Sequence, residues 1–225
     1  MSEMAGRAVS PEECDRLWAA WMPGEVAERM SGVTVPWYVA GGWALELFTE
    51  NAARAHHDLE IGVPEGRFGE IVAAFPGFEW DVIADGRILP FPAEAENQHQ
   101  TWLRDPATGR YHLDVFREPQ DGDRWVCRRD RSITLPCAEL IRHTREGIPY
   151  AIPEVVLLFK AKAPRDKDEA DFRHVLPALD QSQRSRLCEW LSRVHPGHPW
   201  LDRILSDCWG SRAVSDGSRR ELPRG

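Results

Sequence analysis

The segment RAHHDLEIGV, residues 54–63, places two carboxylates in a stretch that otherwise has the alternating pattern of a buried strand. Three apolar residues alternate there with polar or small ones: Leu59, Ile61 and Val63. Because a strand points residues two apart to the same face, Asp58 and Glu60 would lie side by side, with Cα atoms about 6.5 Å apart. Two carboxylates at that spacing repel each other, and each loses hydration on burial. The pattern therefore predicts a positive charge bound between them.

The composition limits the class of partner. The chain has 225 residues, 42% of them hydrophobic, and its formal net charge of −8 argues against a nucleic-acid partner and favours a cationic one. The five cysteines form no Cys-x-x-Cys pair, so neither a zinc site nor a disulfide framework is indicated. Neither a signal-peptide pattern nor a run of about 18 apolar residues is present. We therefore expect a cytoplasmic protein with no membrane partner.

A pair of glycines lies just upstream of the charged segment. The stretch VPWYVAGGWALELF, residues 35–48, predicts a short strand over 37–40, a turn at Gly41 and Gly42, and then a helix. Residues without a Cβ would let the backbone N–H groups at the start of that helix approach a triphosphate. Trp43 would then line the nucleotide cleft. The alternative is a tight turn that binds nothing.

A third carboxylate follows from a predicted hairpin. The segments 99–105 and 110–118 flank a turn that contains Pro106 and Gly109. On the second arm, Asp114 leaves an apolar strand on a definite face. Two carboxylates on one strand and a third on a nearby strand are typical of two-metal phosphoryl transfer, in which the ions lie about 3.5–4 Å apart.

These features predict a role for each carboxylate. Asp58 and Glu60 would hold two Mg²⁺ ions, and Asp114 would bind the ion at the attacking hydroxyl and orient or deprotonate that group. The alternative is that all three are solvent-facing strand residues.

The rest of the chain reads mainly as helices. Ser10 and Pro11 predict a helix start, and an apolar stripe indicates an amphipathic helix: Cys14, Leu17, Trp18 and Trp21. After residue 136 the strand pattern gives way to helical stripes. Lys160 ends an apolar run and could reach a triphosphate, as could Lys167, although Lys167 and Asp171 could equally form a surface pair.

Residues 37–63 carry a resemblance to a known family. The stretches GGWALELF and ARAHHDLEIGV resemble the Gly-Gly-Trp-Ala and His-x-Asp-x-Asp signature of the aminoglycoside and lincosamide adenylyltransferases. These antibiotic nucleotidyltransferases are part of the DNA polymerase β-like superfamily, and the segment HLDVF offers the third carboxylate at Asp114. Two departures stand out: Gly-Gly replaces the Gly-Ser of the wider superfamily, and Glu60 stands where Asp is usual.

The resemblance implies an α+β fold, in which a polymerase β-like mixed sheet with helices precedes a helical C-terminal domain. We place the nucleotidyltransferase domain at residues 1–136, the helical domain at 137–210 and a disordered tail at 211–225.

The resemblance also implies an activity. The chain would move a nucleoside monophosphate, most simply AMP from ATP, to a hydroxyl of a small cationic acceptor such as an aminoglycoside antibiotic. The implied catalytic and metal-binding residues are Asp58, Glu60 and Asp114. The implied nucleotide-binding residues are Gly41, Gly42, Trp43, Lys160 and Lys167. Two alternatives stay open: a toxin-type nucleotidyltransferase that modifies tRNA or a protein, and a nucleotide-binding module without catalysis. The acceptor, the nucleotide base and the oligomeric state are left open by the sequence.

Overall fold

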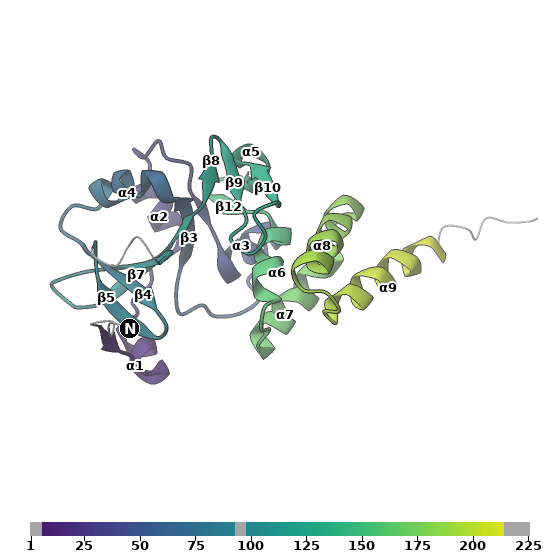
Figure 1. The fold of residues 1–225 in the computed structure, drawn as a ribbon, viewed down its shortest axis with the longest axis horizontal. Helices are drawn as coiled ribbons and strands as arrows, with labels where there is room; N and C mark the ends of the chain where they lie inside the picture. Colours follow the sequence, from purple (N-terminus) through teal and green to yellow (C-terminus); the bar gives the residue numbers. More distant parts are fainter. Residues whose placement is uncertain (1–5, 93–97, 214–225) are drawn as a thin grey trace, which may run out of the picture. The chain divides into compact units, whose positions relative to one another are not determined.

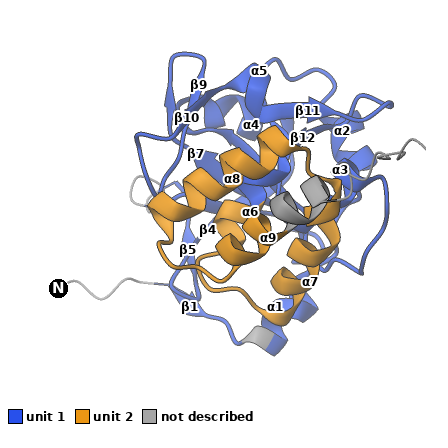
Figure 2. Cartoon of the chain, turned by 90° about the vertical axis from the view of Figure 1, so that its right-hand side faces the viewer, with its two compact units in different colours: residues 1–156 blue, residues 157–225 orange. Residues whose placement is uncertain are grey.

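The computed structural model describes residues 6–92 and 98–213. The chain divides into two compact units, residues 1–156 and 157–225 (Figure 2). Each unit has its own secondary structure and is described separately below.

The N-terminal unit is built on a mixed sheet (Figure 1). Within the described residues it has nine strands in the order β1-β5-β4-β6-β7-β3-β2-β12-β11. Strand β3 runs parallel to β7, and β2 runs parallel to β12, whereas the other neighbours are antiparallel. The strands are β1 (Arg7–Ala8), β2 (Tyr38–Val39), β3 (Glu60–Pro64), β4 (Glu79–Ala84), β5 (Arg87–Pro90), β6 (Gln100–Arg104), β7 (Tyr111–Glu118), β11 (Ile141–His143) and β12 (Pro149–Ala151).

Short helices and a small second sheet complete this unit. The helices are α1 (Pro11–Leu17), α2 (Pro23–Arg29), α3 (Gly41–Thr49), the 3₁₀ turn η1 (Glu65–Arg67), α4 (Phe68–Ala74) and α5 (Cys137–Leu140). The second sheet has the order β10-β9-β8, with β8 (Gln120–Asp121), β9 (Arg124–Val126) and β10 (Thr134–Pro136).

The central strands bury their apolar face completely. Ile61 on β3, Leu113 and Val115 on β7, and Leu103 on β6 are all 0% exposed. Because side chains alternate along a strand, Glu60 and Asp114 lie on the opposite face from these residues. The predicted hairpin is confirmed as β6 and β7, and the predicted helix after the glycine pair is confirmed as α3.

The predicted amphipathic helix from Pro11 to Trp21 is wrong in its second half. Ser10 caps α1 as expected, because its Oγ accepts a hydrogen bond from the Glu13 N–H at 3.2 Å. The helix nevertheless ends at Leu17. The N–H groups of Ala19 and Trp21 donate instead to backbone carbonyls of β7, at 2.9 and 3.2 Å. Pairing with β7 therefore replaces the last turns of the helix.

The C-terminal unit is helical. Helix α6 (Pro153–Lys160) leads into it, and α7 (Asp166–Val175), the 3₁₀ turn η3 (Leu176–Ala178), α8 (Gln181–Val194) and α9 (Trp200–Ala213) follow. Phe172 of α7 stacks on Trp200 of α9 with ring centroids 4.2 Å apart, and both side chains are fully buried. None of the helices in the described part of the chain is long and apolar enough to cross a bilayer.

The division between the units falls later than the position we placed at residues 136 and 137. The segment from 137 to 151 contains α5, β11 and β12, and the last two strands join the nine-stranded sheet through β2. Strand pairing therefore keeps this segment in the N-terminal unit. Of the tail placed at 211–225, residues 211–213 belong to α9, and the rest lies outside the described residues.

Candidate active site

Two adjacent parallel strands bring the predicted carboxylates together. In the register of β3 and β7, Glu60 lies opposite Asp114. The strand begins at Glu60 rather than at Asp58 as we expected, but the Asp114 N–H still donates to the Leu59 carbonyl at 2.9 Å. Asp58 directly precedes this junction. The three carboxylates therefore belong to the start of β3 and the middle of β7 beside it.

Asp114 is the most buried member of the group. Its side chain is 3% exposed, and burial, followed by the charges of Glu60 and Asp58, raises the pKa of its carboxyl well above the ordinary value. Its Oδ2 accepts a hydrogen bond from Gln100 Nε2 at 2.7 Å, and this contact and the indole of Trp102 oppose that rise. Its Oδ1 has no hydrogen-bond partner within the described residues. One oxygen of this buried carboxylate is held, and the other is open.

The carboxylates do not form a complete ligand set as they stand. Across residues 6–92 and 98–213, no group of three or more His, Cys, Asp or Glu side chains is arranged to hold a metal ion. The strand register and the shifted pKa of Asp114 nevertheless place Glu60 and Asp58 in its electrostatic neighbourhood.

The two glycines make close approaches possible at the start of α3. Gly41 has a φ of +57°, and a Cβ there would overlap the carboxylate of Glu60. A Cβ at Gly42 would overlap the guanidinium of Arg54 and the ring of His56. The glycine pair therefore serves a steric purpose in this structure, because charged side chains lie directly against the first turn of the helix.

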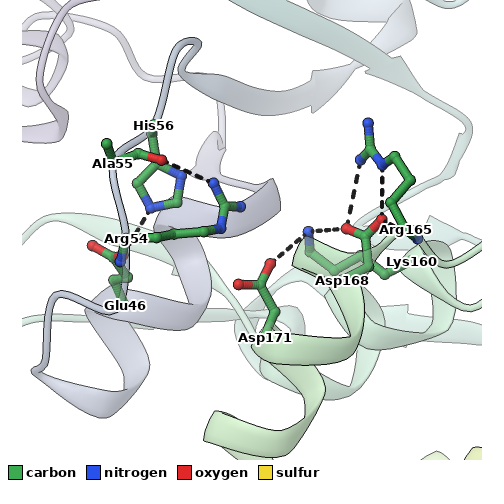
Figure 3. A network of polar contacts seen from close by, with 8 residues as sticks. All are labelled: Glu46, Arg54, Ala55, His56, Lys160, Arg165, Asp168 and Asp171. Carbon is green, nitrogen blue, oxygen red and sulfur yellow. Dashed lines mark hydrogen bonds and ion pairs between the residues drawn. The ribbon is translucent and has the colours of Figure 1, made fainter.

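A buried glutamate holds the loop that leads into the carboxylate segment (Figure 3). Glu46 Oε1 accepts hydrogen bonds from the N–H groups of Ala53 and Arg54, at 2.9 and 3.1 Å, and contacts His56 Nε2 at 2.8 Å. Although burial opposes it, the contact with His56 and the two backbone hydrogen bonds hold the pKa of Glu46 below its ordinary value. Trp43 stacks on the His56 ring with centroids 4.5 Å apart. Trp43 thus has a packing partner that the sequence did not reveal.

The C-terminal unit contains a separate buried ion network (Figure 3). Lys160 Nζ lies 2.8 Å from Asp168 Oδ1 and 2.9 Å from Asp171 Oδ2, and Arg165 Nε donates to Asp168 at 2.9 Å. The Lys160 ammonium thus binds two carboxylates of α7, and its contact with a triphosphate stays a prediction. Lys167 is exposed, and Asp171, which could form a surface pair with it, binds Lys160.

The network makes a stability prediction. Lys160→Met should lower the free energy of unfolding by about 3 kcal/mol, because two buried carboxylates lose the ammonium that they share. Denaturant unfolding of the full chain measures this change. The matched control is Lys167→Met, an exposed change expected to stay within about 0.5 kcal/mol of the wild type. Equal stability of the two variants would show that the network contributes nothing.

Comparisons with known proteins agree with this architecture. Residues 24–102 match the family described as aminoglycoside-2''-adenylyltransferase. A crystal structure of ANT(2")-Ia in complex with adenylyl-2"-tobramycin is similar, with a TM-score of 0.53 and 14% identity over 76% of this chain and 95% of that one. A crystal structure of the lincosamide antibiotic adenylyltransferase LnuA, lincomycin-bound, gives a TM-score of 0.50 and 14% identity over 75% of this chain and 98% of that one. A comparison with curated proteins finds no match.

The similar structures share the predicted α+β fold, which is confirmed, and the family match over residues 24–102 agrees with the predicted enzyme class. The resemblance to the antibiotic nucleotidyltransferases, read from residues 37–63, is likewise confirmed, and the matched region extends it to 24–102.

Proposed function

We propose that the chain transfers a nucleoside monophosphate, most simply AMP from Mg·ATP, to a hydroxyl of a small cationic antibiotic. The observation that carries this proposal is the pairing of Glu60 with Asp114, whose buried carboxylate keeps one oxygen open. The formal net charge of −8 supports a cationic acceptor.

The residues suit a divalent cation. Carboxylate oxygens are the ligands that Mg²⁺ prefers, and the unpartnered Oδ1 of Asp114 is a buried oxygen that a cation would satisfy. Asp58, Glu60 and Asp114 would hold it. A cation bound there would neutralise charge on the triphosphate and make the acceptor hydroxyl more acidic.

The chain's own groups account for the proton. Asp114 would accept the proton of the acceptor hydroxyl. The acceptor oxygen would form a bond to the α-phosphorus, the bond from the α-phosphorus to the bridging oxygen would break, and pyrophosphate would leave. Near Asp114, the buried Trp102 ring would help to exclude water.

The test is pyrophosphate release from the full chain with each NTP, Mg²⁺ and a panel of aminoglycosides and lincosamides. We expect release with ATP and a cationic acceptor, and loss of release when EDTA removes the metal. Mass spectrometry should find the acceptor heavier by one AMP. Binding of Mg·ATP with no release for any acceptor would favour a nucleotide-binding module and overturn the proposed transfer. Release only in the presence of tRNA or a protein would favour the toxin-type alternative.

A further inference from the structure

Strand β6 brings a neutral amide to the buried carboxylate of β7. In the antiparallel register, Trp102 lies opposite Asp114, and Gln100 is two residues from Trp102 on the same face of β6. The Gln100 side chain reaches diagonally across the pair, and its Nε2 donates to Asp114 Oδ2 at 2.7 Å. A carboxylate accepts but does not donate, so this contact requires the NH₂ end of the amide to face Asp114.

The two oxygens of Asp114 therefore have different surroundings. Oδ2 accepts the Gln100 hydrogen bond, whereas Oδ1 has no hydrogen-bond partner among the described residues, although the side chain is only 3% exposed. A buried anionic oxygen without a partner is costly. The Gln100 hydrogen bond to Oδ2 thus leaves Oδ1 as the open oxygen.

We propose that Gln100 is a positioning residue, which holds Asp114 by Oδ2 so that Oδ1 is the oxygen presented to the divalent cation and the acceptor hydroxyl. This inference rests on the proposed function. A neutral donor suits the task, because an Arg or Lys at this position would neutralise the carboxylate that the cation needs. Without the amide, Asp114 would lose its 2.7 Å hydrogen bond, and the indole of Trp102 would be the remaining side-chain donor beside it.

The test compares Gln100→Met with Gln120→Met. Methionine matches glutamine in length but cannot donate. The control residue, Gln120, is also a half-buried strand glutamine, and its Nε2 donates to Cys137 Sγ at 3.6 Å in the smaller sheet. The two changes therefore remove the same chemical group, and only one of them removes it from Asp114. Gln100→Leu provides a second variant if the methionine protein does not fold.

Two readouts separate positioning from a merely structural role. The first is the affinity for Mn²⁺ alone, measured by electron paramagnetic resonance, which Gln100→Met should weaken by about tenfold. The second is steady-state pyrophosphate release, for which kcat should fall by about tenfold or more while the KM for ATP changes by less than about threefold. Gln120→Met should match the wild type in both.

The outcomes are distinguishable. Wild-type Mn²⁺ affinity and kcat in both Gln100 variants would overturn the role of Gln100 and leave the proposed function intact. A wild type that neither binds Mn²⁺ nor releases pyrophosphate would overturn the proposed function itself.

Discussion

Asp114→Asn is expected to reduce pyrophosphate release by at least about a hundredfold at saturating Mg·ATP, which is the usual scale for the loss of a general base. The amide cannot accept the hydroxyl proton and offers a neutral oxygen in place of a charged one. The Gln100 contact is preserved, because the Asn carbonyl oxygen can still accept from Nε2. Asp121→Asn on β8 is the control, because Asp121 is an exposed strand carboxylate outside the site.

The same substitution, which lowers activity, should maintain or increase the stability of the fold. Burial and neighbouring charge raise the pKa of Asp114, so the folded chain holds this proton at pH values where the unfolded chain, with a pKa of about 3.9, has released it. The stability that the protonated Asp114 carboxyl contributes is fully present below its pKa in the unfolded chain. It is lost as the pH rises through its pKa in the folded chain. In metal-free buffer, Asp114→Asn should therefore match or exceed the wild type in denaturant unfolding, and its advantage should grow as pH rises. A marked loss of stability at pH 8 would instead identify a structural aspartate.

The sequence predicted the elements of the site whose placement depends on local pattern. Alternation along residues 110–118 put Asp114 on one face of an apolar strand, and the glycine pair marked the start of α3. Both signals act within a few residues, so no long-range information was needed. The pairing of Glu60 with Asp114 then follows from the parallel register of two strands that the sequence had already indicated.

The remaining features depend on tertiary contacts. The stripe up to Trp21 had helical spacing, yet backbone hydrogen bonds to β7 stabilise an extended segment after Leu17. Gln100 is one polar residue on a strand, and only the register shows that it reaches Asp114. Glu46 is one polar residue in a helical pattern, and its partners come from a loop seven to ten residues further on. Lys160 ended an apolar run, but its partners on α7 could not be assigned from spacing alone.

The structure gives the unusual glutamate a steric context. The Glu60 carboxylate lies where a Cβ of residue 41 would be, so the longer side chain and the glycine at 41 are matched. Glu60 is therefore compatible with a site role rather than a sign that the site has been lost. Its carboxylate lies against the first residue of α3, on the same face of the sheet as Asp114.

Gly41→Ala should lower the free energy of unfolding by about 2–4 kcal/mol, because alanine is strained at a φ of +57° and its Cβ overlaps Glu60. Gly109→Ala is the matched control: its φ is +70°, but nothing lies within 4 Å of the added Cβ. That variant isolates the backbone strain, which should cost about 1–2 kcal/mol. Denaturant unfolding measures both changes.

Substitutions of Glu60 distinguish a metal ligand from a solvent-facing strand residue. Glu60→Gln should reduce pyrophosphate release by about a hundredfold, because a neutral amide replaces a charged ligand, whereas Glu60→Asp should retain measurable turnover. Glu60→Asp should also relieve the overlap in Gly41→Ala, so the double variant should be more stable than the sum of the single changes by about 1 kcal/mol. The same Asp substitution combined with Gly109→Ala should be additive. If the unfolding free energies are additive in both double-variant cycles, Glu60 and Gly41 are not sterically matched. If wild type, Glu60→Gln and Glu60→Asp release pyrophosphate at equal rates, Glu60 is not part of the site, because a solvent-facing strand residue tolerates either change.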